Sequence, residues 1–419
     1  MTLRLCMLTQ YFPPEMGAPQ GRLSELGERL MERGWQVDVL TALPNYPTGR
    51  VFDGYDPRRA VVEQVGRMRT ARVPLIPAKA GFARRLCCYF SFAATSAALG
   101  PKLLGRPDLL WVESPPLFIG FAARVLTARW RCPYVLNVSD LWPESAIRMG
   151  VIKPGPVARA AEALELWLYR RSAGVTGQSE EIIASVRARA FGVPTETVTN
   201  GVDAQRFGRD KVDAEARQLV GRESGPVFMY AGLLGLAQGL DQILDVAASL
   251  PPRFPARFVI VGEGPAREAL ERRIAAERLA GRVRLVPPVP RDRVPALLAA
   301  ADVAVVSLGM SIPGAVPSKI YEAMAAALPI VLIADGEPAR RVEAAGAGLW
   351  ASPGDLDTVR AHVERLARDA ELRLRLGTAG RRAAETTYDR ANIAERLDAF
   401  LRRAVSSGGT KDKRQERVA

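Results

Sequence analysis

A short segment in the second half of the chain places a serine, a lysine and a glutamate at the expected start of a helix. Ser318, Lys319 and Glu322 lie in VPSKIYEAMAAALPIV, where most of the other residues are apolar. Pro317 ends an extended segment, Ser318 is a favourable N-cap, and the residues after it have high helix propensity. The pattern predicts a helix whose first turn carries one positive and one negative charge.

This helix start has the chemistry of a phosphate and sugar site. The N–H groups of Lys319 and Ile320 are expected to be free, and Lys319 adds a full positive charge to the helix dipole. Glu322 lies on the same face as Ser318, about one turn deeper, where its carboxylate can accept hydrogen bonds from two neighbouring hydroxyl groups. A diphosphate beside a cis-diol describes a nucleotide. The alternative, that Glu322 only complements the helix dipole, is equally good on spacing alone.

Other candidate residues directly follow predicted strands, where ligands of open α/β sheets bind. Gly17, in EMGAPQG, precedes a helix and lets phosphate or sugar approach the backbone, although most such glycines only make turns. Gly262 and Gly264 follow FVIVG, but Arg267 stands in place of the third glycine of a dinucleotide fingerprint, which argues against a Rossmann dehydrogenase. Asp140, in VSDLWPES, is either a polar residue of a binding or catalytic site or the first residue of an Asx turn.

Charge and rare residue types limit the possible functions. The 419 residues include 58 basic and 45 acidic side chains, for a net charge of +13 that favours anionic partners. The basic residues are dispersed, so nucleic acid is not expected as a partner. The single histidine, His362, lies in a polar helical pattern, and the four cysteines form no CxxC pair. We therefore expect no metal, reduced thiols and a cytoplasmic protein.

An alternation of strand-like and helix-like segments runs twice along the chain. Strands are expected at RLCMLTQYF, at WQVDVLTALP and at 108–114, 133–140 and 174–179, and the alternation restarts near residue 225. The pattern predicts the α/β class, with two doubly wound domains and a polar linker at 199–225. The expected boundaries are 1–205 for the first domain, 206–385 for the second, 386–405 for a C-terminal helix packing back on the first, and 406–419 for a disordered tail.

One helical stretch suits two environments. Residues 81–106 carry about fourteen apolar or small residues between Arg84, Arg85 and Lys102, too few to span a bilayer. The stretch is either a buried helix over the first sheet or an interfacial helix on an anionic membrane surface. The residues expected to face the membrane are Phe82, Tyr89, Phe90 and Phe92, with Arg124, Arg129 and Arg131 as an extension.

Several motifs, in their order along the chain, resemble the GT-B glycosyltransferases of family 4. The likeness is greatest to the bacterial branch that adds deoxy or amino sugars to lipid-linked polysaccharide precursors. It covers roughly residues 1–350 and implies two Rossmann-like domains that face a cleft. The stretches that carry it are QYFPPEMGAPQGRLSELGERLMERGWQVDVLTALPNYPTG, VSDLWPES, TNGVD, YAGLLGLAQGLDQIL, FVIVGEGP and VPSKIYEAMAAALPIV.

The resemblance implies a retaining, metal-independent transferase without a cofactor, whose donor is a nucleotide-sugar, expected to be UDP-linked. The helix start would face the diphosphate, Glu322 the ribose, and Gly17 the donor phosphate from the other domain. The residues implied for catalysis are Asp140, Lys319 and Glu322, and those implied for donor binding are Gly17, Gly262, Gly264, Ser318, Lys319, Ile320 and Glu322.

Four positions depart from the family pattern. Gly314 replaces a glutamate eight residues before Glu322, Ala18 replaces the second glycine of the first loop, and Gln238 replaces a lysine. A histidine usual near the end of the VSD strand is also absent. These losses fit a deoxy or N-acetylamino donor sugar such as N-acetylfucosamine, because each missing partner would otherwise leave a sugar hydroxyl unpaired.

The resemblance also implies an acceptor and a place in the cell. The acceptor would be a polyprenyl-diphosphate-linked sugar of O-antigen or capsule synthesis. The protein would be peripheral on the inner face of the bacterial cell membrane. Two alternatives stay open: a GT-B-fold UDP-sugar epimerase, against which the single histidine counts, and a glycosyltransferase with a soluble acceptor.

Overall fold

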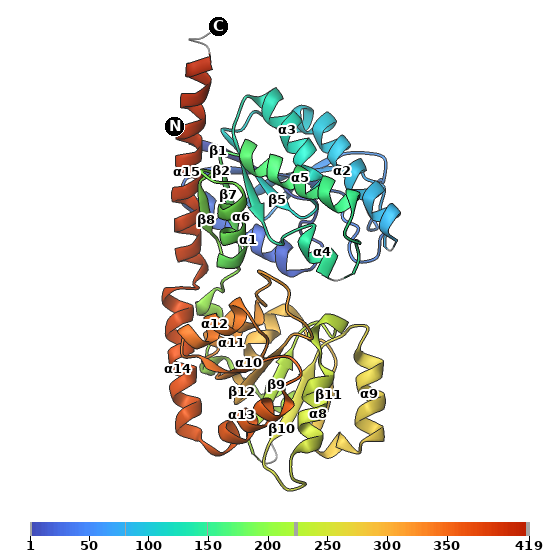
Figure 1. Cartoon of the computed structure of the whole chain (residues 1–419), viewed down its shortest axis with the longest axis vertical. Coiled ribbons are helices and arrows are strands. Elements are labelled where there is room, and N and C mark those ends of the chain that lie inside the picture. The colour runs from blue at the N-terminus through green and yellow to red at the C-terminus, as the bar shows by residue number, and fades with distance from the viewer. Residues whose placement is uncertain (1, 80, 149, 222–224, 416–419) are drawn as a thin grey trace. The chain divides into compact units, whose positions relative to one another are not determined.

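The computed structural model describes residues 2–79, 81–148, 150–221 and 225–415, which fold into two α/β units (Figure 1). The N-terminal unit comprises Met1–Thr199 and Ile393–Ala419, and the C-terminal unit comprises Asn200–Asn392. Each unit is built on its own largely parallel sheet with helices on both faces. The predicted fold class, two doubly wound α/β domains, is confirmed.

The described part of the N-terminal unit forms an eight-stranded sheet of order β3-β4-β2-β1-β5-β6-β7-β8. Its strand pairs are parallel except for the antiparallel pair of β3 and β4. The strands are β1 (Leu3–Leu8), β2 (Trp35–Ala42), β3 (Val61–Val65), β4 (Met68–Val73), β5 (Leu109–Ser114), β6 (Tyr134–Val138), β7 (Gly174–Gly177) and β8 (Thr195–Thr197). The helices are α1 (Ala18–Glu32), α2 (Phe82–Leu103), α3 (Ile119–Trp130), α4 (Glu144–Arg148), α5 (Pro156–Arg171), α6 (Glu180–Arg189) and α15 (Arg390–Gln415).

The described part of the C-terminal unit forms a six-stranded parallel sheet of order β11-β10-β9-β12-β13-β14. The strands are β9 (Val227–Ala231), β10 (Arg257–Val261), β11 (Val283–Val286), β12 (Val303–Ser307), β13 (Ile330–Ile333) and β14 (Gly348–Ala351). The helices are α7 (Ala214–Val220), α8 (Asp241–Ser249), α9 (Arg267–Ala276), α10 (Val294–Ala299), α11 (Lys319–Ala325), α12 (Glu337–Ala344), α13 (Leu356–Arg368) and α14 (Ala370–Thr386).

In both sheets the strand order reverses beside the first strand. β1 lies between β2 and β5, and β9 lies between β10 and β12. The loops that follow these neighbouring strands lead to opposite faces of the sheet, so a crevice opens at the carboxyl ends of the strands. These two switch points are the places at which doubly wound sheets bind ligands.

The C-terminal helix α15 completes the hydrophobic core of the N-terminal unit. Ile393, Leu397 and Leu401 are fully buried, in one apolar cluster with residues of α1, β1 and β2. This helix and α1 cover one face of the sheet (Figure 1), while α2, α3 and α5 contribute to the cluster on the other face.

Two predictions from polar composition were wrong. The expected linker at 199–225 belongs to the C-terminal unit from Asn200 onward, because its few apolar residues, including Val202, Phe207 and Val220, enter that unit's core. Disorder was predicted from residue 406, but α15 continues to Gln415. A polar segment without proline can extend a helix that its buried preceding turns already hold. Residues 416–419 lie outside the described residues.

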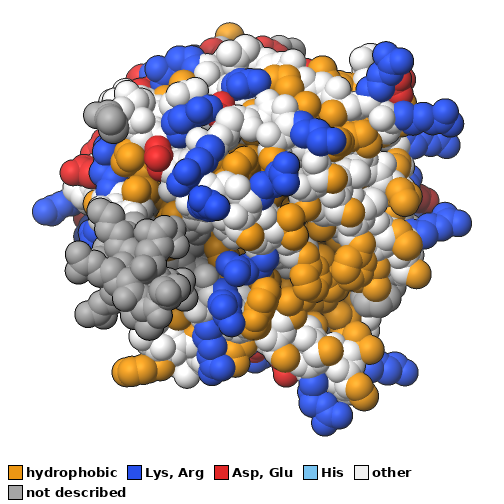
Figure 2. All heavy atoms as spheres, turned by 90° about the horizontal axis from the view of Figure 1, so that it is seen from above, with side chains coloured by type: hydrophobic (Ala, Val, Ile, Leu, Met, Phe, Trp, Pro, Cys, Tyr) orange, Lys and Arg blue, Asp and Glu red, His pale blue; other side chains and the backbone are white. Residues whose placement is uncertain are grey.

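Helix α2 both covers the sheet and presents an exposed face. Cys88 and Phe92 are buried in the core, whereas Phe90 is 45% exposed. The prediction that Phe92 faces a membrane is therefore wrong, and the side chain of Phe82 lies outside the described part of the chain. Figure 2 shows a face of the molecule on which hydrophobic side chains gather between those of arginine and lysine. Among the described helices, none combines the length and hydropathy needed to cross a bilayer.

Candidate active site

Lys319 stands at the switch point of the C-terminal sheet. It is the first residue of α11, which follows β12, and its side chain reaches the end of the neighbouring strand β9. Its Nζ lies 5.2 Å from the centroid of the ring of Tyr230, the residue before the last of β9. The predicted lysine is thus placed where a ligand of this sheet would bind.

In the described part of the chain, no anionic group contacts the ammonium group of Lys319. Within the residues that the structure describes, it makes no hydrogen bond or ion pair, and it lies over the face of the Tyr230 ring. Burial lowers the pKa of Lys319, an effect that the nearby charge of Glu322 partly opposes. Because a desolvated cation without a partner is unfavourable, the arrangement favours an incoming anion such as a diphosphate.

The path of the lysine side chain depends on a glycine. Gly232 follows β9 with a φ of +146°, a conformation that side chains disfavour, and a Cβ there would collide with Cε of Lys319 and lie 2.8 Å from Nζ. The missing side chain at residue 232 therefore keeps the channel open along which Lys319 lies.

The glycines predicted to bind the donor after β10 have a packing role in this structure. A Cβ on Gly262 would collide with the carbonyl oxygen of Gly232, and one on Gly264 with that of Leu234. The two loops are also joined by a hydrogen bond of 2.9 Å from Leu234 N to Glu263 O. Gly262 and Gly264 thus allow the loop after β10 to lie against the loop that borders Lys319. Their contact with a donor stays a prediction.

Glu322 lines a small pocket of the C-terminal unit among three arginines. Arg206, Arg291 and Arg390 line the same pocket. Burial raises the pKa of Glu322, and Lys319 and the three arginines act in the opposite direction. In the described part of the chain the carboxylate accepts no hydrogen bond from protein, so its oxygens can accept hydrogen bonds from the hydroxyl groups of a ligand. Sequence reasoning missed these arginines, because they are far apart along the chain and form no local pattern.

The start of α11 differs in part from the prediction. Ser318 precedes the helix, but it has helical backbone angles and its side chain makes no capping hydrogen bond. The N–H group of Ile320 donates to Pro317 O at 3.2 Å, and the Ile320 side chain is fully buried. The prediction that this N–H group is free is wrong, because the turn before the helix already uses it. At this helix start, binding of an anion would therefore depend mainly on Lys319.

Two of the positions that depart from the family pattern lie in this unit. Gln238 ends a short 3-10 turn, Leu236–Gln238, and the carbonyl oxygen of its side chain is buried without a hydrogen-bond partner among the described residues. Gly314 has a φ of +75°, which is unfavourable for a glutamate. The backbone at residue 314 therefore suits the glycine that is present.

Asp140 lies in the N-terminal unit, two residues after β6. Its Oδ2 accepts a hydrogen bond of 2.8 Å from Ser145 Oγ, and burial raises its pKa. Trp142 N donates to Asp140 O at 3.0 Å, so the residue also begins a turn. The structure is thus compatible with both interpretations made from the sequence, and the catalytic role of Asp140 stays a prediction.

Gly17 immediately precedes α1, as predicted, at the switch point of the N-terminal sheet. A side chain on Gly17 would meet the amide of Gln20, with its Cβ 2.9 Å from Gln20 Cδ. Gln20 is buried, and its Oε1 has no hydrogen-bond partner in the described structure. Gly17 and Lys319 belong to different units, so a joint contact with one donor phosphate stays a prediction.

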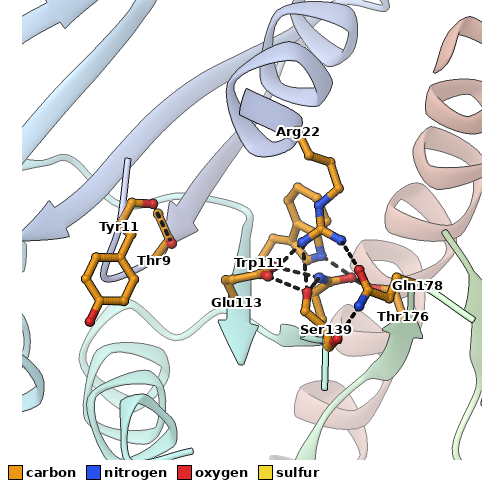
Figure 3. A network of polar contacts seen from close by, with 9 residues as sticks. Thr9, Tyr11, Arg22, Trp111, Glu113, Ser139, Thr176 and Gln178 are labelled. Carbon is orange, nitrogen blue, oxygen red and sulfur yellow. Dashed lines mark hydrogen bonds and ion pairs between the residues drawn. The ribbon is translucent and has the colours of Figure 1, made fainter. Parts of the chain in front are cut away.

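A polar network at the switch point of the N-terminal sheet was not predicted from the sequence. Figure 3 shows Arg22 of α1 directed toward Glu113, Ser139 and Gln178, which come from the ends of β5, β6 and β7. The available signal was a glutamate within the apolar run DLLWVES, because an acid in a buried strand needs a partner.

Comparisons with known proteins agree with this architecture. Residues 17–201 match the family model described as "Glycosyl transferase 4-like domain", and residues 212–383 match "Glycosyl transferases group 1". The chain is 28% identical over 397 residues to "Putative colanic acid biosynthesis glycosyl transferase WcaI" of Escherichia coli (strain K12), covering 91% of this chain and 95% of the relative.

Solved structures with the same fold include two further proteins. Sucrose-phosphate synthase from Thermosynechococcus elongatus has a TM-score of 0.73 at 19% identity, over 97% of this chain and 100% of that chain. HepE of Anabaena, solved in complex with UDP and glucose, has a TM-score of 0.69 at 16% identity, over 95% of this chain and 99% of that chain.

The two sheets and these matches define a glycosyltransferase of the GT-B fold. The two family models together match both halves of the chain, and the protein is a glycosyltransferase of the family 4 type.

Substitution of Gly232 should displace Lys319 and weaken binding of a nucleoside diphosphate. We expect Gly232→Ala to raise the dissociation constant of UDP at least about tenfold, measured by calorimetry, because the new methyl group occupies the channel of the lysine. Gly281→Ala is a matched control, since a Cβ there meets nothing within 4 Å. Unchanged UDP binding by a folded Gly232→Ala protein would contradict the role of Lys319.

Binding of UDP should be confined to a narrower pH range than ordinary lysine and glutamate would give. Burial lowers the pKa of Lys319, so as the pH rises this side chain loses its positive charge below the usual lysine pKa of about 10.4. Burial raises the pKa of Glu322, so as the pH falls its carboxylate is protonated above the usual glutamate pKa of about 4.3. In calorimetric titrations at different pH values, Glu322→Gln should abolish the loss of UDP affinity at low pH and leave the loss at high pH unchanged. If affinity still falls at low pH in Glu322→Gln, Glu322 is not the cause of that fall.

Proposed function

We propose that the protein is a retaining glycosyltransferase that moves a sugar from a UDP-sugar to a polyprenyl-diphosphate-linked sugar in surface polysaccharide synthesis. The observation that carries this proposal is the ammonium of Lys319 at a switch point, which has no hydrogen-bond or ion-pair partner among the described residues, with the carboxylate of Glu322 in the same helix turn. A cation for the diphosphate and an acceptor for the ribose hydroxyls together suit a nucleotide-sugar. HepE, which shares the fold, was solved with UDP and glucose.

The reaction requires little more of the protein than positioning and charge stabilisation. The bond between the sugar's anomeric carbon and the diphosphate oxygen breaks, and the acceptor hydroxyl forms the new bond at that carbon. Negative charge develops on the leaving diphosphate, which the ammonium of Lys319 would stabilise. The leaving phosphate oxygen would take the proton of the acceptor hydroxyl on the same face, which gives retention without a metal or another cofactor.

The donor is proposed to carry a deoxy or N-acetylamino sugar, such as N-acetylfucosamine. Gly314 provides no carboxylate for the sugar hydroxyls, and its backbone angles favour glycine at that position. A hydroxyl group that lost its partner on binding would weaken the complex, so a sugar with fewer hydroxyls fits better. Asp140 of the N-terminal unit is proposed to contact this sugar or to orient the acceptor hydroxyl.

The lipid part of the acceptor is supported by an aromatic cluster next to Asp140. Phe90 of α2 lies 4.4 Å from Phe118 between ring centroids, and Phe118 lies 5.7 Å from Trp142, two residues after Asp140. Phe90 and Phe121 are 45% and 44% exposed. Exposed aromatic rings flanked by arginines suit the interface of an anionic membrane, and we propose that the protein is peripheral on the inner face of the cell membrane.

The role in polysaccharide synthesis is supported by the relative WcaI, whose name assigns it to colanic acid biosynthesis. Its alignment covers nearly the full length of both chains, so the relation includes both units. A lipid-linked acceptor and a membrane-facing surface are consistent with such a pathway.

Loss of either predicted nucleotide contact should lower turnover. We expect Lys319→Ala and Glu322→Ala each to reduce turnover at least about tenfold, because each loses a contact to the diphosphate or the ribose. The assay is release of UDP from UDP-sugars in the presence of membrane lipid extract. Exposed Lys153→Ala and Glu371→Ala are matched controls. Near-normal activity of both site variants would reject the site.

The same assay separates the proposed reaction from its alternatives. UDP release that requires the acceptor indicates transfer, whereas conversion of the UDP-sugar without UDP release indicates an epimerase. Activity with a water-soluble sugar alone would favour a soluble acceptor. A clear preference for UDP-glucose over UDP-N-acetylfucosamine would contradict the proposed donor.

Charge reversal at the start of α2 should weaken membrane binding. Arg84 and Arg85 are exposed, and we expect Arg84→Glu/Arg85→Glu to lower the fraction that sediments with anionic vesicles at least about fivefold. Arg58→Glu/Arg59→Glu changes the net charge equally at another exposed arginine pair and is the control. Equal sedimentation of the α2 variant and the wild type would show that α2 does not contact the membrane.

A further inference from the structure

A buried arginine meets a buried glutamate at the switch point of the N-terminal sheet (Figure 3). Arg22 in α1 is 2% exposed and Glu113, the residue before the last of β5, is 6% exposed. Nη2 of Arg22 donates to Glu113 Oε1 at 2.7 Å and to Ser139 Oγ at 2.8 Å. The ion pair therefore joins α1 to the ends of β5 and β6.

Glu113 and its neighbours connect three strand ends into one network. Oε2 of Glu113 accepts a hydrogen bond of 2.6 Å from Asn137 Nδ2, and Oε1 accepts a short hydrogen bond from Ser139 Oγ. Asn137 Oδ1 accepts from Thr176 Oγ1 of β7 at 2.6 Å. Gln178, directly after β7, donates a short hydrogen bond to the carbonyl oxygen of Ser139. Each strand end is thus bonded to the next through side chains.

Stability alone does not account for such a pair. Removing two charges from water costs several kcal/mol for each ion, and apolar residues of similar size are often as stabilising or more so. A network of several buried hydrogen bonds instead restricts the geometry, because a shift of one member weakens its bonds in a low-dielectric surrounding. The network therefore indicates a position that has to be held accurately.

The position that the network holds is the residue before Asp140. Ser139 is bonded through its hydroxyl and its carbonyl, and its N–H donates to Ser114 O at 2.8 Å. Asp140 follows directly, and Ser145 holds its carboxylate at 2.8 Å. The hydrogen bonds of Ser139 thus fix the backbone directly before Asp140, and the direction of the Asp140 carboxylate depends on that backbone.

We propose that Arg22 and Glu113 are positioning residues, which hold Ser139 and thereby aim Asp140 at the transferred sugar or the acceptor hydroxyl. This inference rests on the proposed function, in which Asp140 makes that contact. Both side chains are buried and engaged with each other, so they act through Ser139 and need not touch the substrate.

The sharpest test is Ser139→Ala. This change removes the hydroxyl shared by Arg22 and Glu113 but leaves the two charges paired, so the protein should fold. We expect kcat to fall at least about tenfold while the dissociation constant of UDP, whose predicted contacts are Lys319 and Glu322, changes less than about twofold. Ser249→Ala, which removes an exposed hydroxyl bonded to Val246 O, is the control. Equal loss of UDP affinity, or normal kcat, would overturn the inference.

A double-mutant cycle separates positioning from a general structural effect. If Glu113 acts through Asp140, Glu113→Gln should lower kcat on its own but add less than about twofold to the loss in Asp140→Asn. Losses that multiply fully in the double variant would show that Glu113 acts independently of Asp140 and would overturn the inference.

Amide hydrogen exchange tests the positioning without relying on turnover. In Glu113→Gln, exchange should become faster in residues 139–146, while residues 43–48, which follow β2, keep their wild-type rates. If the wild type transfers no sugar, the proposed function fails, yet faster exchange confined to residues 139–146 still supports the positioning by Glu113. Unchanged exchange there, or faster exchange throughout the N-terminal unit, would overturn it.

Discussion

The ammonium of Lys319 is largely withdrawn from water and faces an aromatic ring instead of a carboxylate. Several features of the C-terminal unit follow from this arrangement. Gly232 leaves out a side chain so that the lysine can pass, and Gly262 lets the next loop lie against Gly232. Glu322 is near enough to moderate the charge without neutralising it by a direct bond. An anionic ligand would supply the partner that the described protein atoms do not provide.

The two units treat charge at their switch points in opposite ways. In the C-terminal unit, Lys319 and Glu322 retain binding capacity that the described protein atoms do not use. In the N-terminal unit, the charges of Arg22 and Glu113 are paired with each other inside the protein. The first arrangement is suited to binding and the second to fixing a geometry. A transferase needs both, because a donor has to be held by strong contacts while the reacting groups meet at a defined distance.

Most of the parallel strands could be predicted from the sequence because they are buried and appear as continuous apolar runs. The edge strands β8 and β14 were missed, since they are short and partly exposed. The hairpin of β3 and β4 was missed because its residues are partly polar, although the two-residue turn Gly66–Arg67 between alternating segments is a hairpin signal. The linker and tail predictions failed because polar composition does not show whether a few apolar residues, such as Phe207, enter a core.

The predictable part of the site is the part that is local in sequence. Lys319 and Glu322 share one helix turn, so their spacing alone placed them together. Arg206, Arg291 and Arg390 reach one pocket only through the folding of the C-terminal unit, and Arg22 meets Glu113 across 91 positions of sequence. The use of the Ile320 N–H group depended on the exact path of the turn before α11, which residue types do not determine.

The placement of α15 in the core of the N-terminal unit has a consequence for biosynthesis. The chain leaves this unit after Thr199 and returns to it at Ile393, so the C-terminal unit is contiguous and complete before α15 has been made beyond its first turn. On the ribosome the second unit in the sequence can therefore finish folding first. Until then, the first unit lacks Ile393, Leu397 and Leu401, and it exposes the apolar surface of α1 and β2 that these residues later cover.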